Sequence, residues 1–159
     1  MKFICDSMLG KLCKWLRILG YDAELVPHDK RDVQLMLLNA RNEKYIILTR
    51  EKSLLAHKDE VRIIFFVQQH WRMQLKHLFK ELGMTPEKDK FFTRCIICNK
   101  ELKSISKEEI TETLPESVLE RNYEFSMCPN CLKIYWHGTH LNLALKEIEE
   151  IIKNVETGL

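Results

Sequence analysis

Apolar and polar residues alternate with two different periods along the first half of the chain. Short apolar runs, typical of buried strands, occur at residues 2–5, 23–26, 45–49 and 62–67. Between and after them, apolar residues recur at helical spacing, which predicts helices at residues 8–19, 32–42 and 70–82 and a short helical turn at 51–56. Strands that alternate with helices favour a parallel sheet covered by helices on both faces. We therefore expect an α/β fold for this part of the chain.

The second half of the chain is organised differently. Residues 84–92 carry Pro86 and several charges and predict a linker, so we divide the chain into domains 1–90 and 91–159. A last helix is predicted at about residues 140–153, where one apolar stripe consists of Leu141, Ala144, Leu145, Ile148, Ile151 and Ile152. The second part is thus expected to be a small module that ends in a C-terminal helix.

The composition is that of an ordinary globular protein. The chain has 159 residues, of which 45% are hydrophobic and 30% are charged, a balance that argues against disorder. Its longest apolar run, Ile63 to Val67, is far shorter than the roughly 20 residues that a membrane span needs. Asp6 also interrupts the N-terminal apolar stretch too early for a secretory signal. We expect a soluble cytoplasmic protein that does not bind membranes.

The net charge of +2 hides a difference between the two halves. Residues 1–92 hold 17 Lys and Arg against 12 Asp and Glu, whereas residues 93–159 hold 8 against 11. A first domain with a charge of +5 suits a polyanionic partner, although two ordinary solvated surfaces would give the same counts. The basic residues of the first predicted helix could hold a phosphate backbone or simply form its solvated face: Lys11, Lys14 and Arg17.

Four of the six cysteines form two CxxC pairs that are separated by 29 residues. The pairs are Cys95 with Cys98 and Cys128 with Cys131. Each CxxC turn places two thiolates on one side of a tight knuckle, and two knuckles supply the tetrahedral sulfur set that zinc prefers. A four-cysteine site has no open coordination position. The sequence therefore predicts one structural zinc ion, not a catalytic one.

The remaining cysteines, Cys5 and Cys13, lie in apolar patterns and are predicted to be buried small side chains. Structural disulfides are disfavoured because reducing cytosol opposes them. Within the long segment between the two CxxC pairs, Ser106 and Glu109 have the spacing of a helix capping box. That segment is therefore expected to contain structure of its own.

Acidic residues follow the predicted strands at their carboxyl ends. Asp6 follows the first strand, Glu51 follows the third, and Asp29 and Asp32 lie between the second strand and its helix. In a doubly wound parallel sheet these positions meet at one edge, and clustered carboxylates are the ligands that Mg²⁺ and Mn²⁺ require. Each acid also has a plainer interpretation, as a cap of a helix or turn or as an ordinary loop acid. The positions alone leave both interpretations open.

Several stretches of the chain resemble one known family. They are DSMLGKLCKWLRILGYD (Asp6–Asp22), ILTREKSLL (Ile47–Leu55), RCIICNKEL (Arg94–Leu102), CPNC (Cys128–Cys131) and IYWHGTH (Ile134–His140). In this order, over residues 1 to about 141, they resemble the Mut-seven C-terminal RNase family. The resemblance implies a PIN-like fold, a zinc ribbon and metal-dependent cleavage of RNA. By position, it assigns the catalytic Mg²⁺ or Mn²⁺ site to Asp6, Asp32 and Glu51.

The chain departs from the family pattern in two places. The family usually has Asp where Glu51 stands, and the stretch FFVQQHW after the fourth strand has no acid, although PIN-like sites often have one there. His140 is a family position that could orient the last helix or contact RNA. The leading hypothesis is a metal-dependent ribonuclease. The alternatives are a non-catalytic RNA- or ribosome-binding zinc-ribbon protein, whose acids only cap helices, and a protein-interaction adaptor docked through the last helix.

Overall fold

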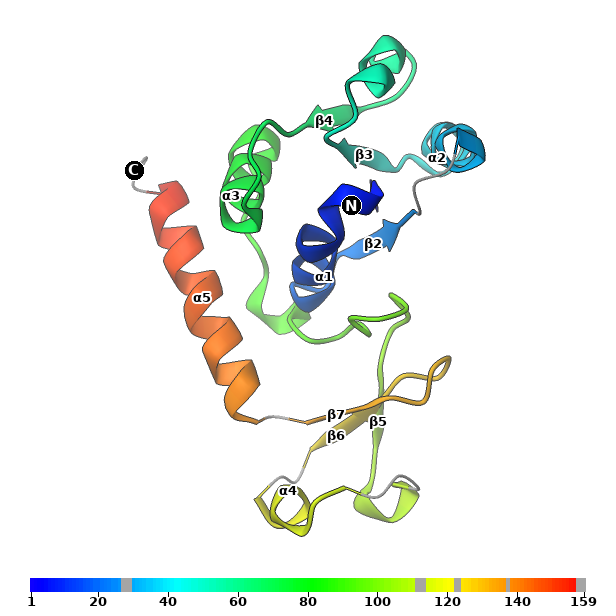
Figure 1. Ribbon diagram of the computed structural model, residues 1–159. Coiled ribbons are helices and arrows are strands. Elements are labelled where there is room, and N and C mark those ends of the chain that lie inside the picture. The colour runs from blue at the N-terminus through cyan, green and yellow to red at the C-terminus, as the bar shows by residue number, and fades with distance from the viewer. Residues whose placement is uncertain (27–29, 111–113, 122–123, 137, 157–159) are drawn as a thin grey trace. The chain divides into compact units, whose positions relative to one another are not determined.

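A computed structural model of the chain describes residues 1–26, 30–110, 114–121, 124–136 and 138–156 (Figure 1). The side chains of residues 30–32, 139–140 and 154–156 also lie outside this description. The chain divides into two compact units, unit 1 (Met1–Asn99) and unit 2 (Lys100–Leu159), each of which is described by itself. Within the described ranges, every helix is too short or too polar to cross a membrane.

Unit 1 is built on a parallel sheet of four strands. The strands are β1 (Lys2–Cys5), β2 (Asp22–Leu25), β3 (Ile46–Thr49) and β4 (Ile63–Phe65). Their order is β2-β1-β3-β4, and all three neighbouring pairs are parallel. The strand order reverses between β1 and β3, and ligands of such sheets bind beyond the carboxyl ends at this reversal. The predicted α/β fold with a parallel sheet is confirmed.

Three helices and three 3-10 turns lie between and after these strands. The helices are α1 (Gly10–Ile18), α2 (Lys30–Glu43) and α3 (Trp71–Leu82), and the turns are η1 (Ser7–Leu9), η2 (Lys52–His57) and η3 (Lys88–Lys90). Helices α1 and α3 contact each other, whereas α2 contacts β3. As the sequence predicts, α3 ends at Gly83, whose φ of 58° suits a residue without a Cβ. Strand β4 is shorter than the predicted run 62–67.

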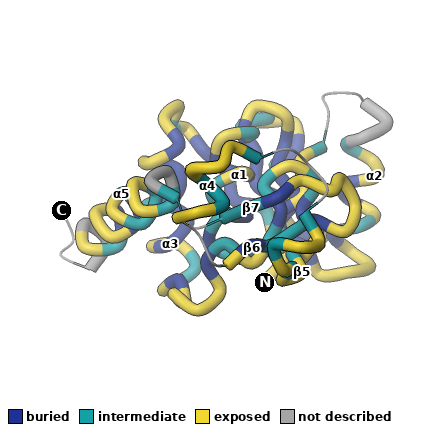
Figure 2. Tube along the Cα trace, turned by 90° about the horizontal axis from the view of Figure 1, so that it is seen from below, coloured by how far each residue is buried: buried dark blue, intermediate teal, exposed yellow. Residues whose placement is uncertain are grey.

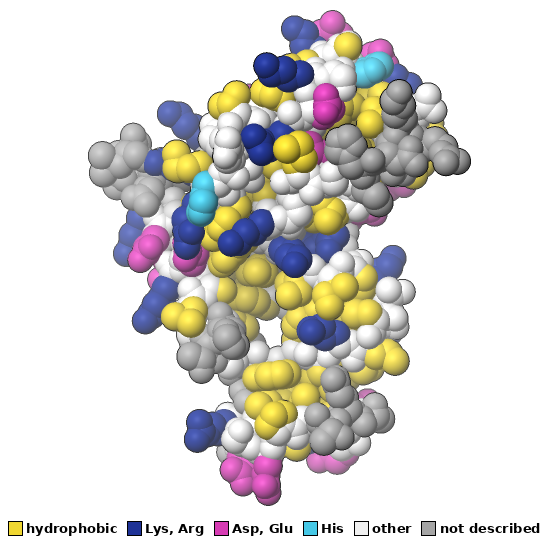
Figure 3. All heavy atoms as spheres, viewed as in Figure 1, with side chains coloured by type: hydrophobic (Ala, Val, Ile, Leu, Met, Phe, Trp, Pro, Cys, Tyr) yellow, Lys and Arg dark blue, Asp and Glu magenta, His cyan; other side chains and the backbone are white. Residues whose placement is uncertain are grey.

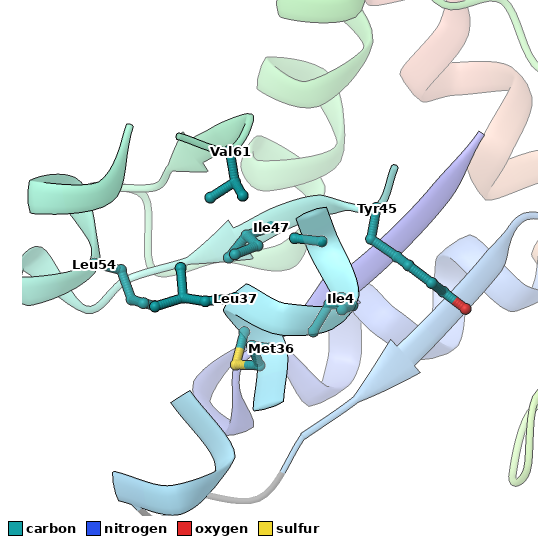
Figure 4. Close-up of a cluster of buried hydrophobic side chains, with 8 residues drawn as sticks. Ile4, Met36, Leu37, Tyr45, Ile47, Leu54 and Val61 are labelled. Atoms are coloured by element: carbon teal, nitrogen blue, oxygen red, sulfur yellow. The ribbon is translucent and has the colours of Figure 1, made fainter. Parts of the chain in front are cut away.

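A hydrophobic cluster attaches α2 to the sheet (Figure 4). Ile4 and Ile47 come from the two central strands and meet Met36 and Leu37 of α2. Burial of each such side chain contributes about 1.5–3 kcal/mol. All four residues of β3 are buried, as expected for a central parallel strand that is covered on both faces.

The segment after α3 packs on unit 1, which corrects the expectation of a linker at residues 84–92. Met84 and Phe91 are buried, and the backbone N–H of Phe92 donates to the carbonyl of Ile18 at 2.8 Å. Gly20, with a φ of 84°, passes so close that a Cβ there would lie 2.2 Å from the carbonyl oxygen of Lys90. The charged residues of this segment suggested a linker, but Met84 and Phe91 pack it against the rest of the unit.

Unit 2 contains an antiparallel sheet in the order β5-β6-β7. Its elements are β5 (Lys103–Ile105), η4 (Lys107–Glu109), α4 (Glu116–Arg121), β6 (Phe125–Met127), β7 (Ile134–Trp136) and α5 (Thr139–Glu156). Ser106 and Glu109 form the predicted capping box at η4. Exposed and less exposed residues alternate along α5 (Figure 2), where Ile148 and Ile151 are buried as its apolar stripe predicts.

Candidate functional site

Asp6 is the first residue after β1, and its side chain is held by η1 and by the carboxyl end of β3. Its Oδ1 accepts a hydrogen bond from the backbone N–H of Met8 at 2.9 Å. Its Oδ2 accepts from the Thr49 hydroxyl at 2.5 Å and from the backbone N–H of Arg50 at 2.7 Å. Asp6 is only 8% exposed, so these bonds fix the carboxylate at the reversal of the sheet. A carboxylate has about four lone-pair positions, so three accepted bonds leave about one for a ligand.

Glu51 is linked to Asp6 through the side chain of Thr49. The backbone N–H of Glu51 donates to Thr49 Oγ1 at 2.8 Å, and the same hydroxyl donates to Asp6. The carboxylate of Glu51 accepts from the backbone N–H of Ser53 at 3.3 Å. A line of hydrogen bonds thus joins two predicted acidic residues across the carboxyl ends of β1 and β3.

Both acids also perform the plainer role that the sequence left open. Asp6 is the N-cap of η1, and Glu51 is the N-cap of η2. Asp32 belongs to the first turn of α2, but its side chain lies outside the described residues, as does the whole of Asp29. Among the side chains that the structure describes, the group of three or more potential metal ligands is formed by cysteines, not by acids.

The three basic residues predicted to bind RNA lie in two different environments. Lys11 and Lys14 are exposed on α1, and Lys and Arg side chains are spread over the face of unit 1 that Figure 3 shows. The ammonium of Lys11 lies 5.6 Å from the ring centroid of Trp71, which stacks on Trp15 at 4.3 Å. Lys11 and Lys14 are therefore available to a polyanion.

Arg17 is only 7% exposed and serves the structure of unit 1. Its Nε donates to the carbonyl of Ala23 at 2.7 Å, and its Nη1 donates to the carbonyls of Ile96 at 3.0 Å and Ile97 at 2.7 Å. This differs from the expectation that Arg17 shares an exposed RNA-binding face. Because its donors are directed at carbonyls within the unit, we leave it out of that face.

Asn99 completes the attachment of the first cysteine knuckle to β2. Its side-chain oxygen accepts from the backbone N–H of Ala23 at 3.1 Å, and its amide nitrogen donates to Asp22 at 2.6 Å. Asn99 thereby satisfies the backbone N–H of Ala23 on the open side of β2, which is an edge strand. Nothing in the local sequence around Asn99 predicted this role, because its partners lie in a distant part of the chain.

The sulfur atoms of Cys95, Cys98, Cys128 and Cys131 all lie within 4.8 Å of one another. Four sulfurs around a zinc ion with bonds of about 2.3 Å are roughly 3.8 Å apart, so this set fits one tetrahedral ion after a small adjustment. The two knuckles also share a backbone conformation. In each, the residue after the second cysteine donates its N–H to the carbonyl of the first at 3.0 Å and has a positive φ, 65° at Asn99 and 59° at Leu132. The predicted four-cysteine metal-binding cluster is present.

Cys5 and Cys13 are buried, as the apolar pattern predicts. Burial raises the pKa of the Cys5 thiol well above its usual value. Cys5 is therefore a neutral thiol at pH 7 and supplies no nucleophile beside Asp6.

Comparison with known proteins agrees with this arrangement. A model of the Mut7-C RNAse domain family matches residues 1–148, a range that includes both the sheet edge at Asp6 and all four clustered cysteines. Neither the search of curated proteins nor the search of solved structures finds a match. Because the family model covers nearly the whole sequence, the chain belongs to the Mut7-C RNAse domain family.

Proposed function

We propose that this protein is a metal-dependent ribonuclease that hydrolyses phosphodiester bonds of RNA. The observation that carries the proposal is the line of hydrogen bonds from the Asp6 carboxylate through the Thr49 hydroxyl to the backbone N–H of Glu51 at the sheet reversal. In a chain of an RNAse-domain family, this edge is where a substrate of the sheet would bind.

In this proposal Asp6, Asp32 and Glu51 hold Mg²⁺ or Mn²⁺, directly or through water. The donor set fits, because hard divalent cations prefer carboxylate oxygens and Mg²⁺ keeps several of its own waters. Asp6 has about one lone-pair position left for such a ligand, and its three hydrogen bonds set the direction of that position. When bound, ions of this kind activate water and neutralise charge that develops on phosphorus.

The other residues orient these groups and hold the substrate. Thr49 and the backbone of Arg50 keep the Asp6 carboxylate in place before any ligand arrives. Lys11 and Lys14, exposed on the helix that follows Asp6, contact the RNA backbone. The mechanism needs no protein nucleophile, which agrees with the neutral thiol of Cys5.

The four clustered cysteines bind a structural zinc ion in the same proposal. Zinc would fix the first knuckle, which Arg17 and Asn99 attach to α1 and β2. Metal-bound rather than disulfide-bonded cysteines suit the reducing cytoplasm, where we place the protein. RNA is its expected partner.

One observation favours a second function, RNA or ribosome binding without cleavage. Asp6 and Glu51 both cap 3-10 turns, so each acid has a structural reason to occupy its position. In that case the exposed basic residues would bind RNA, and the acids would take no part in chemistry.

Cleavage of labelled single-stranded and structured RNAs with Mn²⁺ separates the two functions. The decisive variant is Glu51→Gln, which removes the charge but keeps an oxygen that can cap η2. It should lower the cleavage rate about 10²–10³-fold, as is typical when one oriented electrostatic group is lost. Glu51→Asp should retain activity, because the family usually has Asp there.

The matched control is Glu81→Gln, since Glu81 is exposed on α3 away from the sheet edge. It should cleave RNA as the wild type does. Equal cleavage by the Glu51→Gln and Glu81→Gln variants would remove Glu51 from the mechanism. Wild-type protein that binds RNA but cleaves none of these substrates with Mn²⁺ or Mg²⁺ would establish the non-catalytic function.

A further inference from the structure

Three buried side-chain polar atoms of the described residues have no hydrogen-bond partner: Arg50 Nε, Gln68 Oε1 and Trp71 Nε1. Buried polar groups are nearly always paired, and an exception in a native fold calls for a specific cause, such as a bound ligand or water. All three residues follow the carboxyl ends of β3 and β4, on the side of the sheet edge where Asp6 lies. The exceptions are thus concentrated at the proposed active edge.

The backbone around these atoms is firmly held. Arg50 donates its backbone N–H to Asp6 Oδ2 at 2.7 Å, so its side chain starts next to the proposed catalytic carboxylate. The amide nitrogen of Gln74, a residue of α3, donates to the carbonyls of Gln68 at 2.8 Å and Gln69 at 3.3 Å. Trp71 is 4% exposed and stacks on Trp15. Trp71 therefore cannot turn its N–H out to solvent without losing this packing.

The chemistry of the three atoms points to a nucleotide. Arg50 Nε and Trp71 Nε1 are donors, and a guanidinium is the side chain best matched to phosphate oxygens. Gln68 Oε1 is an acceptor, and the ribose 2′-hydroxyl, which distinguishes RNA from DNA, can donate to it. A strand of RNA offers both complements within one nucleotide unit, whereas a fully ionised inorganic anion such as sulfate offers acceptors alone.

We propose that Arg50, Gln68 and Trp71 form a nucleotide-binding subsite beside Asp6, in which Arg50 binds an RNA phosphate and Gln68 accepts a hydrogen bond from a 2′-hydroxyl. This subsite rests on the proposed ribonuclease function and deepens it. The subsite also gives the uncharged stretch after β4, where the sequence shows no fourth acid, a role in binding RNA through Gln68. An amide at that position would select the ribose instead of holding a cation.

The test measures binding of a labelled single-stranded RNA and a DNA of the same sequence to the full chain. Buffer without Mg²⁺ or Mn²⁺ and without chelator keeps the RNA intact and any bound metal at the cysteines. Arg50→Met should weaken RNA binding about 10-fold, the range expected for a charge-assisted contact to phosphate. The control is Arg62→Met, because Arg62 is exposed at the opposite, amino end of β4. It should change affinity less than threefold.

The variant Gln68→Met removes the acceptor with little change in size. It should weaken RNA binding but leave DNA binding unchanged, so that the preference for RNA falls. Equal RNA affinities of the Arg50→Met and Arg62→Met variants would overturn the phosphate contact, and an unchanged RNA preference in Gln68→Met would overturn the 2′-hydroxyl contact. A lower melting temperature of Arg50→Met with unaltered RNA binding would show that its role is structural and would also overturn the subsite.

The same variants separate this subsite from the proposed reaction. Arg50-dependent RNA binding by a wild-type protein that never cleaves RNA would support the subsite and reject hydrolysis. If Mn²⁺-dependent cleavage requires Glu51 but Arg50→Met binds RNA as the wild type does, hydrolysis is supported and the subsite is rejected. Failure of the wild type to bind RNA at all would reject both.

Discussion

Replacement of Arg17 by Met should destabilise the protein and loosen the first cysteine knuckle. Met keeps much of the apolar stem of Arg but none of its donors. The change therefore removes one hydrogen bond to Ala23 in β2 and one each to Ile96 and Ile97 in the knuckle. These bonds connect α1 both to β2, six residues further along the chain, and to the knuckle, 79 and 80 residues further along.

The size of the effect follows from the surroundings of each carbonyl. Ala23 is fully buried, so its carbonyl loses a charged donor that water cannot replace, at about 1–3 kcal/mol. The thiol of Cys13 still approaches that carbonyl at 3.4 Å, which offsets part of the loss. Ile97 is 55% exposed, so water can reach its carbonyl and that loss is near the lower end of about 0.5–1.5 kcal/mol. The half-buried Ile96 loses one further bond, at about 0.5–1.5 kcal/mol. With the offset from Cys13, the total is about 2–4 kcal/mol, or a fall in melting temperature of about 4–16 °C for a chain of this length.

Thermal unfolding followed by circular dichroism measures the first effect, and the rate of metal release to a chelator measures the second. The matched control is Lys14→Met, one turn earlier on α1, because Lys14 is exposed. It should stay within about 0.5 kcal/mol of the wild type. If Arg17→Met unfolds and releases metal as Lys14→Met does, the structural role assigned to Arg17 is wrong.

Two further predictions concern the metal and the basic face. Protein purified without added metal should contain about one zinc per chain by elemental analysis. The Cys128→Ser variant should contain less zinc and an unfolded module, because metal affinity contributes to folding there. A metal-free wild type that folds normally would contradict this prediction. Binding of RNA should weaken steeply as the salt concentration rises. The double variant Lys11→Ala, Lys14→Ala should bind unrelated RNA sequences more weakly and with less dependence on salt, because phosphate contacts are lost. An RNA affinity that is independent of salt would show that the basic face does not bind RNA.

Local patterns in the sequence predicted the fold well because local forces set it. The run Lys2–Cys5 is a strand with the predicted boundaries, and Gly83 ends α3 in the left-handed conformation that favours glycine. The CxxC pairs predicted their own cluster because the chemistry of a knuckle needs only four consecutive residues. The strand, the helix end and each single knuckle are thus specified within a few residues, whereas the cluster also needs the two knuckles to meet.

The sequence could not predict roles that depend on distant parts of the chain. Arg17 occupies a helical position compatible with a solvated face, and its burial depends on carbonyls 79 and 80 residues away. Thr49 reads as the last residue of a strand, and its hydroxyl becomes a link between two acids only when β3 pairs with β1. Positional reasoning about the sheet brought Asp6 and Glu51 to one edge, but the residues that orient them became visible only with the pairing of the strands.

The hydrogen bonds of Asp6 give one last prediction, that Asp6→Asn acts on stability as well as on chemistry. An amide replaces one carboxylate oxygen with an NH₂ group. In the Oδ1 position this group faces the N–H of Met8, and in the Oδ2 position it faces the N–H of Arg50. Either orientation sets a donor against a donor and should cost about 1–3 kcal/mol, which lowers the melting temperature by about 2–12 °C.

Glu51→Gln should not show this loss, because the side chain of Glu51 accepts only one bond from Ser53 among the described residues, and an amide oxygen can still accept it. Thermal unfolding of both variants without Mg²⁺ or Mn²⁺ makes the comparison. An Asp6→Asn protein that melts with the wild type would mean that these three bonds do not hold the carboxylate. If Asp6→Asn melts at a lower temperature, any loss of its activity combines a less stable sheet edge with a lost charge. Glu51→Gln then measures the contribution of the charge to catalysis more directly.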